Sequence, residues 1–328
     1  MLTVLTCGIK SVAQTTSNPE PKKDSTTFAK RAVASVADKF AIARPFNIEY
    51  TLTAPYRFSS EKNNTSLPDG KVTSFQQLRA STNINFIKRK TWMLGTTLGY
   101  RLTSSETEVS TTGSPMVTIA GDHHYVFGTL NFTYFSTIFK KRSFFSSSFF
   151  VDGSEKQLER IKGIFTGTMV LKANQKTKMT AGFLVNLDAS AQSPVIPTFS
   201  YEHKFNNGLI VDIALPRTIY LRKFIANKGR ISLGTALDQT SFYLYNLDGS
   251  NQKYEYRQLD INSGLVYEHL LGKHFMLTAK SGVKLSPEGR IFKKQDSYAD
   301  PVYQIGPDPA FYFNIGLSFN PFTLFGKN

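Results

Sequence analysis

Asp122, His123 and His124 form the cluster of side chains with the clearest potential for acid–base chemistry. A hydrolase needs a histidine beside a carboxylate or a nucleophile, with further partners supplied by other elements. The triplet falls at the end of a predicted strand, where adjacent residues point to opposite faces. The two histidines therefore do not converge on one site. We expect no enzymatic activity, and a hydrolase is the least favoured of the functions weighed below.

Metal and cofactor chemistry has even less support. The chain contains one cysteine, Cys7, and five histidines, without the CxxC or HExxH spacing that marks zinc sites. A single cysteine forms no internal disulfide. No glycine-rich phosphate loop is present either. The sequence therefore predicts no metal and no cofactor.

The charge balance raises the question of nucleic acid. There are 39 Lys and Arg residues against 24 Asp and Glu residues, a formal net charge of +15. No recognition motif and no basic stripe with interleaved aromatic residues accompanies this charge. The basic triplets 88–90 and 140–142 fall at short predicted turns, where solvated side chains near lipid headgroups are the simpler interpretation. We predict no nucleic-acid partner.

From Pro45 onwards, apolar and polar residues alternate in segment after segment. In the last segment Phe311, Phe313, Ile315, Leu317 and Phe319 alternate with Tyr312, Asn314, Gly316 and Ser318. A period of two is typical of a β-strand with two different faces. The runs of about 10 to 15 residues exceed the usual strand of roughly 5 or 6 and suit strands that cross a bilayer at a tilt.

The connections between these segments alternate between short turns and longer polar loops. The longest predicted loops lie near 61–72, 105–121 and 287–308. Short turns on one side and long loops on the other are typical of outer-membrane barrels. The pattern gives fourteen strands, or twelve if the short pair around Pro216 folds differently. The predicted fold is all-β: a transmembrane antiparallel up-and-down β-barrel of 12 to 14 strands over residues 45–320.

Charged residues on the polar face of this alternation are expected to point into the lumen. They are Glu49, Arg57, Arg79, Arg101, Asp212, Asp260, Glu268, Lys280 and Lys284. Lumen charges tune ion selectivity in a pore. Alternatively, they pair with one another and fill a closed barrel, as Glu49 with Arg79 or Arg101. Both interpretations stay open at this level.

The two ends of the chain differ from the barrel. Residues 1–14 read as a partial secretory signal peptide, an apolar run followed by small residues. Cys7 lies in a segment that loosely resembles a lipid-attachment site. Residues 15–44 form a flexible arm in which 28–40 can make a short amphipathic helix that plugs the lumen or lies on the membrane. Residues 321–328 are a C-terminal tail.

Five stretches of the chain carry a resemblance to known proteins: ARPFNIEY (43–50), LPDGKV (67–72), NINFIKRKTWMLGTTLGYR (83–101), LPRTIYLRKFIANKGRISLGTAL (215–237) and FYFNIGLSFNP (311–321). With them, residues 45–320 resemble the outer-membrane β-barrels of Bacteroidota, and most of all an uncharacterised family, domain of unknown function 6268. Segment 314–319 is similar to the terminal-strand signal of such barrels, although the chain runs on through PFTLFGKN. The resemblance implies a Gram-negative outer membrane, with outer-membrane lipid and the barrel assembly machinery as partners. It implies no activity.

Two functions follow from these expectations. The first is a channel or porin-like protein for small, anionic solutes in the bacterial outer membrane. The second is a closed structural or docking barrel that binds a partner through its extracellular loops, with side chains or the 28–40 helix filling the lumen. Arg79 and Arg101 distinguish the two functions. Replacing both by Glu is expected to change ion selectivity in a pore and mainly to destabilise a plugged barrel.

Overall fold

The structure is a computed structural model that describes residues 25–111, 114–188, 190–247, 249 and 251–321. Within these residues it contains one α-helix, one 3-10 helix and sixteen strands. None of the described helices has the length and apolarity to cross a membrane. The predicted signal peptide with Cys7, and the predicted tail beyond Pro321, lie outside the described residues.

The elements follow one another in a simple order. α1 covers Ser25–Lys39 and η1 covers Ala41–Ala43. The first eight strands are β1 (Phe46–Thr53), β2 (Tyr56–Lys62), β3 (Thr65–Lys88), β4 (Trp92–Thr111), β5 (Ser114–Ile138), β6 (Lys141–Gly153), β7 (Leu158–Ala173) and β8 (Thr177–Asn186). The other eight are β9 (Val195–Lys204), β10 (Leu209–Leu215), β11 (Thr218–Ile225), β12 (Gly229–Tyr245), β13 (Lys253–Leu271), β14 (Phe275–Lys293), β15 (Tyr303–Pro307) and β16 (Ala310–Phe319).

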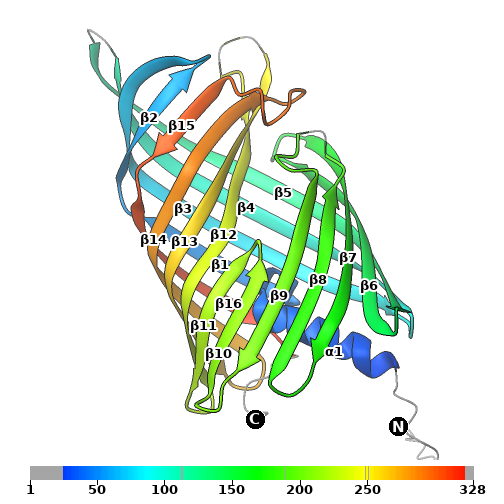
Figure 1. The fold of residues 1–328 in the computed structure, drawn as a ribbon. Helices are drawn as coiled ribbons and strands as arrows, with labels where there is room; N and C mark the ends of the chain where they lie inside the picture. Colours follow the sequence, from blue (N-terminus) through cyan, green and yellow to red (C-terminus); the bar gives the residue numbers. More distant parts are fainter. Residues whose placement is uncertain (1–24, 112–113, 189, 248, 250, 322–328) are drawn as a thin grey trace, which may run out of the picture.

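The strands form one antiparallel sheet that closes on itself (Figure 1). β1 pairs with β3 on one side and with β16 on the other, so the first and last strands seal the ring. β1 and β2 lie end to end and together occupy one strand position of the ring, and β15 and β16 do the same. The sixteen strands therefore occupy fourteen positions. The predicted all-β barrel and its upper count of fourteen are confirmed, and the segments around Pro216 form the short hairpin β10–β11.

The register of β16 against β1 shows how the alternation divides the wall. Phe313 lies opposite Leu52, and both side chains are exposed. Asn314, the next residue, lies opposite Thr51 and is buried. Buried and exposed residues alternate along β16 from Ala310 to Ser318. The apolar face is therefore outside and the polar face inside, as predicted.

The predicted loops 61–72 and 105–121 are wrong in large part. β3 already begins at Thr65, β4 runs on to Thr111 and β5 resumes at Ser114. β14 likewise continues to Lys293. Pairing with a neighbouring strand satisfies the backbone whatever the polarity of the side chains, so polar composition alone does not end a strand.

The ring has two different ends. Short connections, both described chain ends and α1 lie at one end, here called the turn end (Figure 1). The long hairpins project from the other, here called the loop end. The predicted 28–40 helix is confirmed as α1, and it sits at the turn end.

Candidate functional site in the barrel lumen

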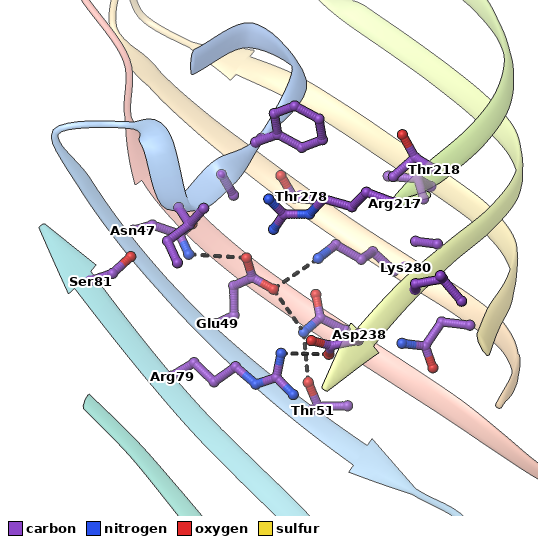
Figure 2. Close-up of a pocket in the computed structure, with 18 of the residues that line it drawn as sticks. Asn47, Glu49, Thr51, Arg79, Ser81, Arg217, Thr218, Asp238, Thr278 and Lys280 are labelled. Atoms are coloured by element: carbon purple, nitrogen blue, oxygen red, sulfur yellow. Dashed lines mark hydrogen bonds and ion pairs between the residues drawn. The ribbon is translucent and has the colours of Figure 1, made fainter. Parts of the chain in front are cut away.

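A cavity of about 260 Å³ lies inside the barrel, next to the turn end (Figure 2). Its walls come from β1, β3–β5, β11–β14 and β16, from the turn between β10 and β11, and from the segment Lys39–Arg44 that leads from α1 into β1. It is strongly basic, because eight Lys and Arg side chains line it against three carboxylates. The cationic residues are Lys39, Arg44, Arg79, Arg101, Arg217, Arg222, Lys280 and Lys284.

Eight of the nine predicted lumen residues lie on the inner side of the wall. Glu49, Arg79, Arg101, Glu268, Lys280 and Lys284 line the cavity itself. Asp212 and Asp260 are fully buried beside it, where Asp212 contacts Arg222 and Asp260 contacts Lys284.

The prediction for Arg57 is wrong. Ala54 and Pro55 interrupt the strand between β1 and β2, which shifts the alternation by one residue. Tyr56 consequently lies opposite the buried Val72, while Arg57 lies opposite the exposed Lys71 and is itself exposed. A one-residue shift moves every following side chain to the other face.

Ion pairs inside the cavity run between strands that are far apart in the sequence. Glu49 accepts hydrogen bonds from Lys280 at 2.8 Å and from Asn47 at 3.0 Å. Arg79 lies 2.5 Å from Asp238 of β12 (Figure 2). The expected pairing of Glu49 with Arg79 therefore gives way to two separate pairs, Glu49–Lys280 and Arg79–Asp238.

The C-terminal end of α1 is bound across the turn end of the lumen. Asp38 pairs with Arg230 of β12 at 2.7 Å. Lys39 contacts Asp212 of β10 at 2.6 Å and Glu202 of β9 at 2.9 Å. Ion pairs to three separate strands close this end of the cavity and hold the helix in place.

Arg44 extends these contacts from the end of α1 into the barrel wall. It donates to the carbonyl oxygen of Ala37 at 3.0 Å and to the hydroxyl of Ser318 at 2.7 Å. It also pairs with Glu268 at 2.9 Å, and Glu268 pairs in turn with Arg230. Arg44 is 2% exposed, so a buried network joins α1 to β12, β13 and β16.

The opposite side of the cavity is closed by β12. β10 and β11 contain seven and eight residues, whereas β12 contains 17. Among the described residues, β12 pairs with β11 only as far as Ala236, and with β13 alone from there to Tyr245. Its upper half is then free to turn inward (Figure 1).

Both faces of this upper half of β12 are buried. Thr240 accepts a hydrogen bond from Gln77 of β3 and donates one to Asp260. Phe242 stacks on His123 of β5, with ring centroids 4.2 Å apart. The residues from Thr240 to Tyr243 are all buried, so this segment lies within the barrel and blocks the lumen above the cavity.

Asp152 of β6 ties this inner segment to the far wall. It accepts hydrogen bonds from Tyr243 at 2.7 Å, from Tyr125 at 2.6 Å and from Lys162 at 2.7 Å. Its side chain is fully buried. Three donors are needed there, because a buried carboxylate without partners is very unfavourable.

The connection between β8 and β9 folds over the loop end. Asp188 contacts Arg160 of β7 at 3.4 Å. Arg257 of β13 donates to the carbonyl oxygen of Ser190 at 2.7 Å and pairs with Glu255 at 2.5 Å. Arg160 also pairs with Glu255 of β13 at 2.9 Å, so ion pairs connect opposite sides of the barrel at the loop end as well as at the turn end.

The Asp122-His123-His124 triplet assembles no common site. His123 stacks on Phe242 inside the barrel, whereas Nδ1 of His124 is 2.8 Å from the hydroxyl of Tyr100. The predicted divergence of the two histidines is confirmed. Across the described residues, no three His, Cys, Asp or Glu side chains come together in a way that suits a metal ion.

Five charged residues that line the cavity were missed by the sequence prediction: Lys39, Arg44, Arg217, Arg222 and Asp238. Asp238 occupies one of the alternating positions of β12 that face inward, so the alternation alone could have predicted its place in the lumen. Arg217 lies in the tight turn between β10 and β11, and the alternation along a strand predicts nothing about the direction of a turn residue. Its place in the cavity follows only from how short that hairpin is.

The fold and the lumen define a closed antiparallel barrel of the outer-membrane type. Residues 41–320 match the family described as a domain of unknown function, DUF6268, and the chain belongs to that family. No curated protein matches the chain.

Solved structures with a similar fold are outer-membrane barrels. An outer membrane channel from Pseudomonas putida F1 has 11% identity and a TM-score of 0.32, covering 84% of this chain and 94% of that one. The transport unit of the autotransporter AIDA-I from Escherichia coli has 10% identity and a TM-score of 0.32, covering 90% and 99%. The outer membrane protease OmpT from Escherichia coli has 7% identity and a TM-score of 0.26, covering 84% and 96%. At these values the likeness concerns the fold and carries nothing about function.

Proposed function

We propose that the protein is an outer-membrane β-barrel whose lumen forms a gated passage for small anionic solutes. The membrane placement rests on the outer surface. Large apolar side chains are exposed around the wall, for example Leu233 on β12, Leu265 on β13 and Phe313 on β16. A contiguous apolar surface of this kind is rare on a water-soluble monomer and matches the lipid-facing band of barrels.

Aromatic residues at the turn end support the same placement. Trp92 lies opposite Tyr134, and Phe275 lies opposite Phe319. Exposed aromatic side chains at one level of a barrel are typical of the girdle at a membrane–water interface. The turn end then faces the periplasm, with α1 on that side.

The observation that carries the passage is the basic cavity closed by a helix held through ion pairs. A lumen that served only as a structural core has no need of cavity-lining arginines without an ion pair, and Arg101 and Arg217 make none among the described residues, whereas the other six cations do. Asp38 and Lys39 hold α1 by side-chain contacts that release without unfolding a strand. In this proposal the closed state is the resting state: opening requires the release of α1 at the turn end and a displacement of Thr240–Tyr243 in the loop half of the lumen, and a permanently open porin is not favoured.

A second candidate is the closed docking barrel. The buried segment Thr240–Tyr243 favours it, because this part of β12 fills the loop half of the lumen. In that case the lumen charges stabilise the barrel and the loop end binds a partner.

Planar-bilayer recording tests the two candidates. Refolded full-length protein is compared with an Asp38→Asn, Lys39→Gln variant, which loses the ion pairs of α1. A gated passage predicts rare openings for the wild type and more frequent openings for the variant. Under a salt gradient, the reversal potential is expected to shift towards the equilibrium potential of the anion. Val36→Ala is the matched control, since Val36 is exposed on the same helix. Silence of the folded variant favours the closed barrel.

A further inference from the structure

The barrel wall is interrupted between β9 and β12. β10 ends at Leu215, opposite Phe199 of β9, and β11 begins at Thr218, opposite Ala236 of β12 (Figure 1). Beyond this short hairpin, β9 continues as far as Val195 and pairs with β8 alone, while β12 pairs with β13 alone. Among the described residues, no strand pairing joins these two edges. This stretch of the wall is here called the side seam.

The outer rim of the side seam is apolar. Val195 and Phe199 on β9 and Leu215 at the end of β10 are all exposed. They belong to the same outer surface as Phe183 of β8, which is exposed opposite Pro197. In the membrane placement proposed above, the side seam therefore faces acyl chains and not water.

The inner face beside the seam is apolar as well. Glu202 of β9 contacts Lys39 of α1 across the lumen, so the even-numbered residues of β9 point inward. Ile196 is one of these residues, and it lies opposite Leu184 of β8. The outward neighbours of both are apolar too, so this part of the wall departs from the polar inner face of β16.

The inner apolar row continues across β7 and β6. Ile164 of β7 shares the inner face with Lys162, whose ammonium group contacts Asp152 inside the barrel and lies 5.6 Å from the ring centre of Phe150. Phe150 stacks on Phe127 of β5, with ring centroids 5.4 Å apart. Because Phe127 lines the basic cavity, the row reaches from the side seam to the cavity.

Four inward side chains make up this row, here called the inner strip: Phe150, Ile164, Leu184 and Ile196. Neighbours in adjacent strands lie directly opposite or diagonally one pair apart, which is within reach of such side chains. All four are half-buried, so part of their apolar surface is open to the lumen. With strands roughly 4.8 Å apart, the strip spans roughly 14 Å and is one side chain wide. This shape suits a single acyl chain.

We propose that the inner strip binds the acyl chain of a single-chain amphiphile, which enters from the bilayer through the side seam. The driving force is the removal of apolar surface from water, both on the chain and on the strip. The inference goes beyond the proposed passage for small solutes and shares with it only the membrane placement.

Quenching of tryptophan fluorescence by a brominated chain tests the strip. Trp92 is the only tryptophan of the chain, so Trp92→Phe gives a silent background for the reporter Leu184→Trp. The full chain is refolded into phosphatidylcholine vesicles and titrated with dibromostearic acid. The reporter is expected to be quenched saturably. Ile164→Thr is expected to raise the half-saturating concentration at least about fourfold, the effect of about one buried methylene group.

Three variants serve as matched controls. Thr180→Trp places the reporter on the same inner face of β8, away from the strip, and is expected to stay unquenched. Phe183→Trp faces the lipid and is expected to be quenched in proportion to the acid in the membrane, without saturation. Ile161→Thr, on the exposed outer face of β7, is expected to leave the saturation of the reporter unchanged.

The shift of the folded barrel in unheated electrophoresis shows which variants have folded, and Ile196→Trp is the second reporter. A folded reporter without saturable quenching overturns the strip, as does equal quenching at Thr180→Trp. Equally strong quenching by vesicles of dibrominated phosphatidylcholine means that two-chain lipids enter too, and it overturns the single-chain assignment.

The controls also separate this inference from the proposed function. An unquenched Phe183→Trp removes the membrane placement, and the strip falls with it. Saturable quenching without any current in the bilayer recording leaves the strip standing and removes the passage for small solutes.

Discussion

The hydroxyl of Tyr243 on β12 donates a 2.7 Å hydrogen bond to Asp152 on β6, across the inside of the barrel. The two strands lie far apart around the ring, so this bond exists only because the upper half of β12 leaves the wall. It joins both walls of the loop half through one buried carboxylate.

Replacing Tyr243 by Phe is expected to loosen this segment. A hydrogen bond to a charged group contributes about 1.5–3 kcal/mol, and Asp152 keeps Tyr125 and Lys162 as donors. We expect a loss of about 1–2 kcal/mol in the free energy of unfolding and faster amide exchange over residues 238–245. Tyr267→Phe is the control, because Tyr267 is exposed and its hydroxyl lies 3.0 Å from Nδ1 of His269. Equal exchange in both variants contradicts the role of β12 as an inner segment.

A charge on the lipid-facing band is expected to impair insertion. Leu265 is 44% exposed on β13, opposite Leu233 of β12. Arginine near the bilayer midplane costs a barrel about 2–4 kcal/mol. We expect Leu265→Arg to lose stability of this order in reversible urea unfolding from lipid vesicles.

Ile119 provides the comparison for that experiment. It is 59% exposed but lies far along β5 towards the loop end, beyond the expected band. Ile119→Arg is expected to unfold like the wild type. Equal destabilisation by the two substitutions argues against the membrane placement.

A side chain at Gly282 is expected to distort the wall. A Cβ atom there meets the carbonyl oxygen of Ser263 at 2.0 Å and the Cα of Gly264 at 2.7 Å. Gly282→Ala is expected to destabilise the barrel by about 1–3 kcal/mol, the usual cost of overpacking. Gly128→Ala, where the nearest atom is 3.4 Å away, is the control in urea unfolding. A neutral Gly282→Ala refutes the close approach of β13 and β14.

Acid is expected to weaken the connection between β8 and β9. Burial opposes the charged form of Asp188, but hydrogen bonds from Ser190 and the charges of Lys162 and Arg160 outweigh it and hold its pKa below the ordinary value. A lowered pKa stabilises the folded state above about pH 4, and this contribution is lost as the pH falls further.

The stability difference between wild type and Asp188→Asn measures this contribution. We expect about 1–2 kcal/mol at pH 6 and a smaller difference at pH 3, in urea unfolding at both values. Asp300→Asn, at an exposed position of the same end, is expected to show no such trend. A difference independent of pH means that Asp188 acts by packing and not by charge.

Sequence alone determined the wall of this protein. The alternation that sets Phe313 outside and Asn314 inside follows from the period of a strand, and it predicted the ring, its fourteen positions and eight of nine lumen residues. It failed at Arg57 because Ala54 and Pro55 interrupt the strand, and an interruption reverses the parity without changing the residue types.

The interior was decided by tertiary structure. Three features depend on contacts between distant strands. α1 closes the turn end, Arg79 pairs with Asp238 and not with Glu49, and Thr240–Tyr243 lie inside the barrel. The period of a strand says which face a residue takes but not what lies across the lumen from it. Arg217 enters the cavity because β10 and β11 end halfway up the wall, and only the assembled ring shows that height.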